Sequence, residues 1–203
     1  MKSIDDHIII KIKKARGGSL FFIEDFLQFG SAKAVGKALE RLVQREEISR
    51  VARGIYARLK THETFGQIQP TAEEIALAIA KRDKARIIPT GSLALNALGL
   101  STQVPMNIVY LTDGSARTIK VGKRTIKFKK SSPRYLSTQG EISSLVIQAL
   151  KEIGKDMATD EEIEKILKHL ENEETHRLVN DIKIAPEWIR VIMRRALKNR
   201  EDE

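Results

Sequence analysis

The residues with the most specific chemical pattern are Gly54-Ile55-Tyr56, inside the stretch SRVARGIYARL at residues 49–59. A Gly-Ile-Tyr tripeptide is half of the signature of a class of metal-dependent nucleases, which carry Tyr-Ile-Gly on a second strand a short distance on. The segment that follows here, ARLKTHETFGQIQP, has no such strand. The tripeptide would also need to open a domain, and here it closes one. The stretch therefore favours a basic β-hairpin in which Ile55 and Tyr56 pack.

A second pattern, at residues 91–113, is typical of nucleotide transfer. Nucleotidyltransferases of the polymerase-β type grip phosphate with Gly-Ser at a helix start and hold two metal ions with a pair of aspartates. Gly91-Ser92 opens a predicted helix here, but Asp113 stands alone, without Asp-x-Asp or Asp-Asp. One carboxylate cannot build a two-metal site. We therefore predict that the protein is not an enzyme.

The other reactive residue types give no metal or cofactor site. The chain has no cysteine, which excludes disulfides, thiolate metal sites and a thiol nucleophile. Its four histidines have no ligand spacing, and no Ser/His/Asp constellation can be argued from the sequence. We predict no metal and no cofactor.

Positive charge is the remaining chemical signal, and it is unevenly distributed. The 203 residues carry a net charge of +9, with 36 Lys+Arg against 27 Asp+Glu. Residues 1–61 hold 13 basic and 7 acidic residues, so under a third of the chain carries +6. Residues 117–134 hold eight basic residues and no acidic one. Such concentration favours a nucleic-acid partner over a uniformly solvated surface.

The helices and strands predicted for the first basic region follow a recognisable order. Residues 4–16 are an amphipathic helix that ends at Gly17-Gly18, SLFF is a short β-like run, and residues 23–29 are a second helix. A third helix covers residues 32–47, and ISRVARGIYARL is a two-stranded hairpin with a turn near residues 52–54. This order predicts a winged helix-turn-helix over residues 1–61.

The third helix has the features of a DNA-recognition helix. Ser31 is a good N-cap, and an apolar stripe lies opposite a mostly basic face. A helix-turn-helix places its second helix in the major groove, N-terminal residues first. The predicted DNA-binding residues are Ser31, Lys33, Lys37 and Arg41 on the helix, and Arg50 and Arg53 at the wing.

A second domain is predicted over residues 71–203, after a polar segment at residues 60–70. Thr71-x-x-Glu74 and Thr159-x-x-Glu162 are capping boxes that open helices. RIIPT and NIVYLTD read as strands, and RTIKVGKRTIKFKK alternates around Gly122 as a basic hairpin. This domain is predicted to be α+β with a helical C-terminal end. The lysines of the hairpin could equally protect a sheet edge.

The sequence as a whole resembles the AbiEi-like antitoxins of type IV toxin–antitoxin systems. RVARGIYARL closes the first domain, and IIPTGSLALNALGLSTQVPMNIVYLTDG and the basic hairpin RTIKVGKRTIKFKKSSPR follow. The chain then ends in helices with an APEWIR turn. The resemblance covers nearly the whole chain.

The resemblance implies a bacterial transcriptional autorepressor that is also an antitoxin. Its winged helix would bind inverted repeats in the promoter of its own operon, through the six DNA-binding residues named above. Its C-terminal domain would counteract a cognate toxin of the nucleotidyltransferase superfamily, by direct binding or through a shared nucleic-acid target. Our own candidates for that second role are the hairpin residues Lys120, Lys123, Arg124, Lys127, Lys129 and Lys130.

Two alternatives stay open at this point. One is a general winged-helix regulator of nucleic acids without a toxin partner, and the weaker one is a nuclease or nucleotidyltransferase. The N-terminal stretch MKSIDDHIII is not a signal peptide, and no apolar run approaches the 18 or so residues of a membrane span. We expect a cytoplasmic protein with no membrane partner.

Overall fold

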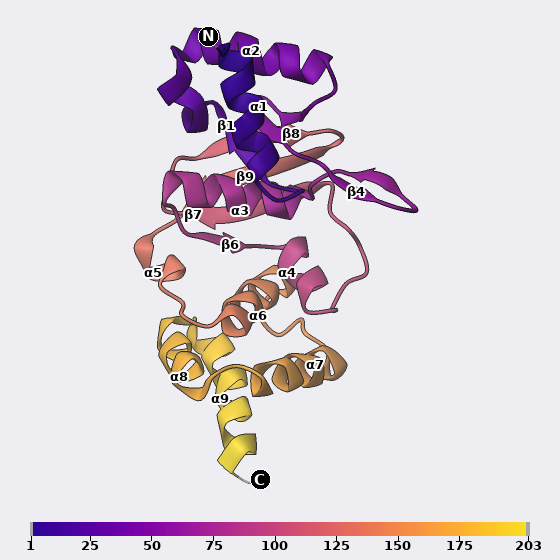
Figure 1. The fold of residues 1–203 in the computed structure, drawn as a ribbon. Coiled ribbons are helices and arrows are strands. Elements are labelled where there is room, and N and C mark those ends of the chain that lie inside the picture. The colour runs from indigo at the N-terminus through magenta and orange to yellow at the C-terminus, as the bar shows by residue number, and fades with distance from the viewer. Residues whose placement is uncertain (1, 202–203) are drawn as a thin grey trace. The chain divides into compact units, whose positions relative to one another are not determined.

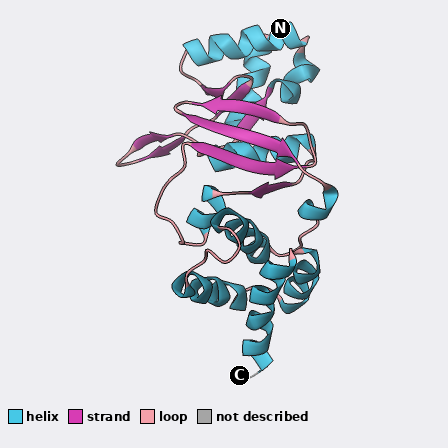
Figure 2. Ribbon diagram, turned by 180° about the vertical axis from the view of Figure 1, so that it is seen from behind, coloured by secondary structure: helices cyan, strands magenta, loops and turns pink. Residues whose placement is uncertain are grey.

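The computed structural model of the chain describes residues 2–201 and combines helices with strands (Figure 1, Figure 2). The predicted α+β class is therefore confirmed. Within the described range the chain forms two compact units. Unit 1 consists of the residues up to 79 and residues 119–125, and unit 2 consists of residues 80–118 and the residues from 126 onward.

Unit 1 combines helices with a small antiparallel sheet. The sheet has the strand order β1-β3-β2, with Phe21 opposite Tyr56 and Ala52 opposite Ile55. The elements are α1 (Ile4–Lys14), β1 (Leu20–Phe22), the 3-10 helix η1 (Ile23–Phe29), α2 (Ala32–Gln44), β2 (Ser49–Ala52), β3 (Ile55–Ala57), β4 (Lys60–His62), β5 (Gly66–Ile68) and the larger part of α3 (Ala72–Asp83).

The core of unit 1 forms where the apolar stripes of α1 and α2 meet. Ile8 and Ile12 of α1 are buried with Val35 and Leu39 of α2. Burial of each such side chain contributes about 1.5–3 kcal/mol. The predicted second helix exists, but it is the 3-10 helix η1, and its Phe26 is fully buried. These contacts leave the opposite face of α2 exposed.

Residues 60–68, taken from the sequence as an irregular polar segment, instead form the antiparallel hairpin β4–β5. Lys60 lies opposite Ile68, and His62 lies opposite Gly66. All six strand residues are exposed, which explains why no hydrophobic alternation marked them. Unit 1 continues through this hairpin into α3.

Unit 2 contains most of a four-stranded sheet with the order β6-β7-β9-β8 and a cluster of helices. The predicted basic hairpin is β8–β9, with Gly122 at its turn in the left-handed region (φ 57°). The elements are β6 (Ile87–Pro89), α4 (Ser92–Ala97), β7 (Asn107–Thr112), β8 (Arg117–Val121), β9 (Arg124–Lys130), α5 (Pro133–Leu136), α6 (Glu141–Ile153), α7 (Asp160–Glu171), α8 (Thr175–Ile184) and α9 (Glu187–Glu201).

In unit 2, α6 packs against α4, α7 and α8, whereas α9 packs against α7 and α8. Two buried carboxylates hold the N-terminus of α6. Asp181 of α8 accepts the backbone N–H groups of Gln139 and Gly140, each at 2.8 Å, and the Ser143 hydroxyl. Glu173 accepts the N–H groups of Ile142 (2.8 Å) and Ser143 (3.1 Å). These acceptors satisfy helix-terminal donors that have no partner within the helix. A side chain at Gly140 would collide with Glu173 and Ser143.

Among the residues that the structure describes, no helix combines the length and the apolar character that a membrane crossing requires.

Candidate nucleic-acid interface

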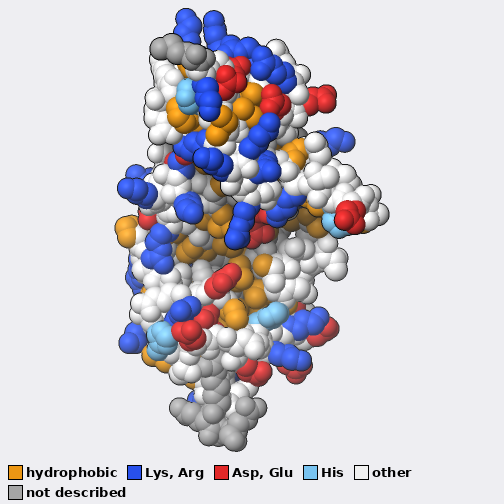
Figure 3. Space-filling view, in the orientation of Figure 1, with side chains coloured by type: hydrophobic (Ala, Val, Ile, Leu, Met, Phe, Trp, Pro, Cys, Tyr) orange, Lys and Arg blue, Asp and Glu red, His pale blue; other side chains and the backbone are white. Residues whose placement is uncertain are grey.

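The exposed face of α2 carries the first candidate residues. Ser31 is the N-cap, and its hydroxyl accepts the N–H of Ala34 at 3.3 Å. Lys33 and Lys37 follow on the exposed face, and neither forms a salt bridge with any described residue. In Figure 3, Lys and Arg side chains gather along the upper rim of the molecule, over α2. Two cations and a helix N-terminus are therefore available to an anionic partner.

Arg41, the fourth candidate on α2, is already engaged. Its Nε lies 2.9 Å from Oδ2 of Asp5, and its Nη2 lies 2.5 Å from Oδ1, so the pair is bidentate. The Arg41 guanidinium holds the pKa of Asp5 below its ordinary value of 3.8. The side chain of Asp5 is 10% exposed and that of Arg41 is 47% exposed. Arg41 thus ties α2 to α1, and only its remaining N–H groups face outward.

The β2–β3 turn presents the other two candidates. Arg53 and Gly54 form the turn between the paired residues Ala52 and Ile55, and Gly54 takes a left-handed conformation (φ 73°). Arg50 and Arg53 are exposed, and within the described residues neither has a salt-bridge partner. All three residues of β3, the strand after the turn, are buried.

The structure buries the side chains of the Gly-Ile-Tyr tripeptide, as the sequence analysis expected. Ile55 and Tyr56 are each 3% exposed, and Tyr56 belongs to the core of unit 1. Burial raises the pKa of the Tyr56 phenol. A phenol in this position contacts the helices of its own unit and is not open to a substrate.

Arg58, in the same stretch, has a role that sequence reasoning missed. Its Nη1 donates to the carbonyl of Lys13 at 2.6 Å and to that of Ala15. These carbonyls lie at the C-terminal end of α1, where helix carbonyls have no partner within the helix. The contact spans 45 residues of sequence, so no local pattern could have predicted it.

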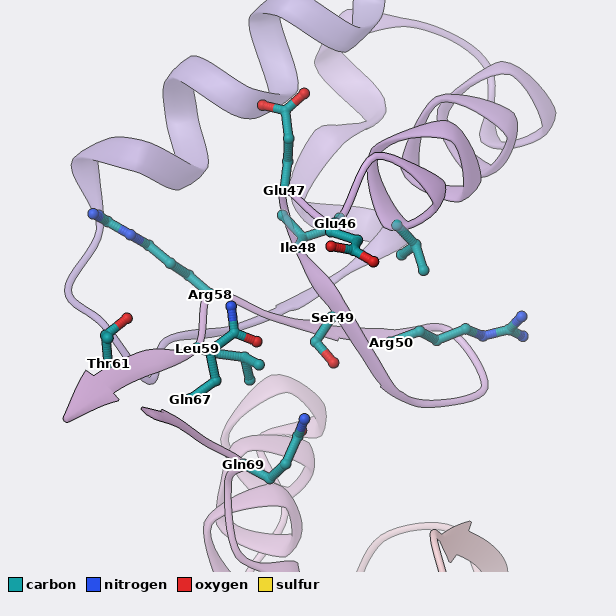
Figure 4. Close-up of a pocket in the computed structure, with 11 residues that line it drawn as sticks. Glu46, Glu47, Ile48, Ser49, Arg50, Arg58, Leu59, Thr61, Gln67 and Gln69 are labelled. Carbon is teal, nitrogen blue, oxygen red and sulfur yellow. The ribbon is translucent and has the colours of Figure 1, made fainter. Parts of the chain in front are cut away.

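A polar pocket of about 680 Å³ lies beside the β2 strand in unit 1. Ser49 and Gln69 point toward each other across it, whereas Arg50 leads away from it (Figure 4). Glu46 and Glu47 also line the pocket, and Glu47 pairs with Lys13 at 3.5 Å. Arg50 and Arg58 line the pocket as well, so its lining has no excess of either charge. No group of three or more His, Asp and Glu in the described residues could hold a metal ion.

The β8–β9 hairpin carries further cations, with residues 119–125 in unit 1 and the rest of the hairpin in unit 2. β9 buries Ile126 and Phe128 and leaves Lys127 and Lys129 exposed. Arg117 at the start of β8 pairs with Asp83 and lies 5.4 Å from the ring of Phe128, so it stabilises the sheet. The six candidates are all exposed and, as far as the chain is described, form no salt bridge: Lys120, Lys123, Arg124, Lys127, Lys129 and Lys130.

The residues of the nucleotide-transfer pattern have structural contacts. Asp113 accepts the backbone N–H of Arg86 at 2.8 Å, next to the strand pair β6–β7. Gly91 has a left-handed conformation (φ 58°), and a Cβ there would lie 3.2 Å from the Glu152 carboxylate. Asp113 therefore closes a loop in the structure.

Comparison with known proteins places the chain in a family. The model of DUF6088, described as a family of unknown function, matches residues 7–178. A search of curated proteins found no match.

Proposed function

The chain belongs to the DUF6088 family, and we propose that it is a DNA-binding transcriptional autorepressor whose second unit acts as an antitoxin. The order α1, β1, η1, α2, β2, β3 supports a winged helix-turn-helix, with α2 as the recognition helix and the β2–β3 turn as the wing. The ground for the second role is the resemblance of the sequence to AbiEi-like antitoxins.

The observation that carries the DNA-binding proposal is the set of free cations on unit 1. Lys33 and Lys37 extend from the first two turns of α2, and Arg50 and Arg53 extend from the β2–β3 turn. All four are exposed without an intramolecular salt bridge among the described residues, so a phosphate backbone can engage them at no cost in broken ion pairs. The N-terminus of α2, which Ser31 caps, would lie at the same surface.

Arg41 has a different part in this proposal. Because its Nε and Nη2 each donate a hydrogen bond to Asp5, Arg41 would contact DNA only through its remaining guanidinium N–H groups. We assign it mainly to fixing α2 on α1, so that the lysines are presented from a rigid helix.

For the second unit, we propose that the protein counteracts a nucleotidyltransferase-type toxin. The exposed lysines of β9 are one candidate surface. A regulator of nucleic acids without a toxin partner is the alternative, and it shares the DNA-binding surface. Tyr56 is buried, and Asp113 accepts a backbone N–H. These contacts support a non-enzymatic role in the antitoxin proposal and in its alternative.

The DNA-binding proposal is tested by titrating the protein against the DNA upstream of its own gene. The logarithm of the binding constant should fall with the logarithm of salt concentration with a slope of about −4 to −6 per bound monomer. The triple variant Lys33→Ala/Lys37→Ala/Arg53→Ala should bind much more weakly.

The matched control removes the same charge from exposed positions in unit 2, as Lys168→Ala/Lys183→Ala/Lys198→Ala. Equal binding by the two triple variants would show that net charge, and not the α2 surface, determines affinity.

The antitoxin proposal is tested in a growth assay in which a neighbouring nucleotidyltransferase-like gene is induced with or without this protein. Rescue of growth supports the antitoxin. If no such gene lies beside it and no rescue occurs, the general regulator is the better description.

A further inference from the structure

The lysines of β9 that belong to unit 2 lie on the exposed face of a sheet. Phe128 is buried and stacks on Tyr110 of β7, with 6.0 Å between the ring centroids. Side chains alternate between the two faces of a strand, so Lys127 and Lys129 point to the opposite face, where both are exposed. In Figure 2 the strands of this sheet are seen with no described helix in front of them. One face of β9 is therefore packed, and the other carries two lysines.

These two lysines do not protect a sheet edge. Lysines on edge strands deter pairing with another chain, but the strand order β6-β7-β9-β8 places β9 in the interior of the sheet. Within the part of the chain that the structure describes, neither Lys127 nor Lys129 forms a salt bridge. Two free cations on an interior strand therefore require another explanation.

The distribution of charge in unit 2 favours an anionic partner at this face. Residues 80–118 and 126–140 include the strands of the unit and hold nine basic and two acidic residues. Residues 141–203, which form the helical end, hold 11 basic and 15 acidic residues. The excess of positive charge in unit 2 thus belongs to the segment that carries the sheet, and such an excess attracts anions.

The two carboxylates of the cationic segment are engaged elsewhere. Asp83 pairs with Arg82 and Arg117, and Arg117 lies on the packed face, over the ring of Phe128. Asp113 accepts a backbone N–H at 2.8 Å. Neither carboxylate is paired with a lysine of β9, so the positive charge of the exposed face is not offset by these two groups.

An aliphatic strip lies beside the two lysines. Val109 and Leu111 of β7 alternate with the buried Tyr110, so they point to the lysine face, where both are half-buried. β7 is the neighbour of β9, and neighbouring strands lie about 4.8 Å apart. On the far side of β7, Ile88 lies opposite Leu111 and is buried. The open part of this face therefore consists of β7 and β9.

We propose that this face of β7 and β9 binds an acidic amphipathic helix of a protein partner. Aliphatic side chains of the helix would cover Val109 and Leu111, and carboxylates beside them would pair with Lys127 and Lys129. A helix with its side chains is about 10 Å wide, which matches two strands about 4.8 Å apart. A helix is also the usual layer on one face of a sheet.

The aliphatic strip favours a protein over a nucleic acid at this face. A phosphate backbone would use the two lysines and leave the strip uncovered. The outward side chains of β7 and of the unit 2 part of β9 include no aromatic ring, whereas unpaired bases are held by stacking on aromatic side chains. An acidic segment with an apolar edge uses both parts of the face.

The identification of this partner with the cognate toxin rests on the proposed function, whereas the binding face itself does not. In that role, the face would neutralise the toxin by direct contact and not through a shared nucleic-acid target. The DNA-binding residues of unit 1 take no part in it.

The test is a fluorescence-anisotropy titration of a labelled synthetic helical peptide with the full chain. The peptide has leucine at every third or fourth position and glutamate beside that stripe, and saturable binding is expected. A second peptide keeps the glutamates and has serine in place of leucine. It should bind at least about tenfold more weakly, which corresponds to about 1.4 kcal/mol. A third peptide with lysine in place of glutamate should not bind.

Two charge-reversed variants locate the site. Lys127→Glu/Lys129→Glu should weaken binding of the acidic peptide at least about tenfold and should bind the lysine peptide instead. The matched control Lys168→Glu/Lys183→Glu makes the same change of charge on α7 and α8 and should retain binding of the acidic peptide. Thermal unfolding of both variants should match the wild type, because all four positions are exposed.

Three results would overturn the proposal. Equal binding of the leucine and serine peptides, or equal effects of the two charge-reversed variants, would show that net charge alone determines affinity. Displacement of the acidic peptide from the Lys33→Ala/Lys37→Ala variant by duplex DNA of unrelated sequence would assign the face to a nucleic acid. A dimer in sedimentation equilibrium that Lys127→Glu/Lys129→Glu dissociates would identify the occupant as a second copy of this chain.

Operator binding is measured on the same preparations, so that the two proposals fail separately. Intact operator binding with no binding of the acidic peptide contradicts the β7–β9 face alone. Peptide binding without operator binding contradicts only the DNA-binding function.

Discussion

The two units of this protein use their charged side chains in opposite ways. In unit 1, the cations of α2 and of the β2–β3 turn point outward, and one arginine, Arg41, is held by a single carboxylate at Asp5. In unit 2, two carboxylates, Glu173 and Asp181, are buried and accept N–H groups at the start of α6. The free cations of unit 1 are available to a partner, and the two buried carboxylates of unit 2 stabilise the fold.

This contrast indicates which charged side chains can be replaced without loss of structure. An exposed lysine without a salt bridge contributes little to folding, so its removal is expected to change binding. A buried carboxylate with several donors cannot be removed without leaving those donors unsatisfied. The comparison therefore predicts that substitutions in the two units have separable effects.

The largest effect is expected for Asp181→Ala. Two backbone N–H groups and the Ser143 hydroxyl lose their acceptor, which should lower the free energy of unfolding by about 3 kcal/mol or more. Chemical denaturation measures this change. Asp113→Ala, which removes an exposed carboxylate from one backbone N–H, is the control and should cost much less. Similar losses of unfolding free energy in both variants would contradict the structural role assigned to Asp181.

The second effect concerns the free lysines of α2. Lys33→Ala/Lys37→Ala should weaken operator binding by roughly 2 kcal/mol, on the order of thirtyfold, because each lost phosphate or base contact is worth about 1 kcal/mol. Its thermal unfolding should stay close to that of the wild type. The matched variant Lys127→Ala/Lys129→Ala removes the same charge from β9. If both double variants bind operator equally, the assignment of DNA binding to α2 is wrong.

A smaller effect is expected for Gly36→Ala, which should raise the stability of the fold and lower its affinity for operator DNA. Gly36 lies inside α2, and an added Cβ would meet no atom within 4 Å. Alanine should therefore raise the free energy of unfolding by about 0.8–1 kcal/mol through helix propensity. If α2 lies against DNA, the new methyl group should also weaken operator binding. Gln44→Ala, at the exposed end of α2, should leave affinity unchanged.

The smallest effect is expected from the pair that links α1 to α2. The pKa of Asp5 is lowered in the folded state, so its contribution to stability is present above the ordinary pKa of 3.8 and is lost as pH falls through the folded value. Asp5→Asn should flatten the loss of unfolding free energy below about pH 4, as measured by denaturation across pH. An unchanged profile would mean that the pair does not stabilise unit 1.

Several local elements were predictable because neighbours in sequence determine them. Ser31 caps α2 as predicted, and Thr159 and Glu162 form the predicted capping box of α7. Likewise, Thr71 and Glu74 exchange hydrogen bonds at the start of α3. In each case the partners lie three residues apart, so the spacing alone brings donor and acceptor together.

Other features escaped prediction because their partners are distant in the chain or because they bury nothing. The hairpin β4–β5 has no buried residue, so no alternation of apolar residues marked it. A small pocket in unit 2 is lined by Ile163 of α7 and Trp188 of α9, and a sequence gives no measure of the space between two helices.

Local sequence patterns were enough to predict the α+β composition, the caps, the hairpin turns at Gly54 and Gly122, and the concentration of cations in residues 1–61. Which of those cations are free depends on the folded chain. Arg41 lies 36 residues from Asp5, Arg58 lies 45 residues from the carbonyl that it caps, and Asp181 lies 42 residues from Gln139. Charge and spacing are local properties that a sequence displays, whereas pairing depends on which surfaces the packed core brings together.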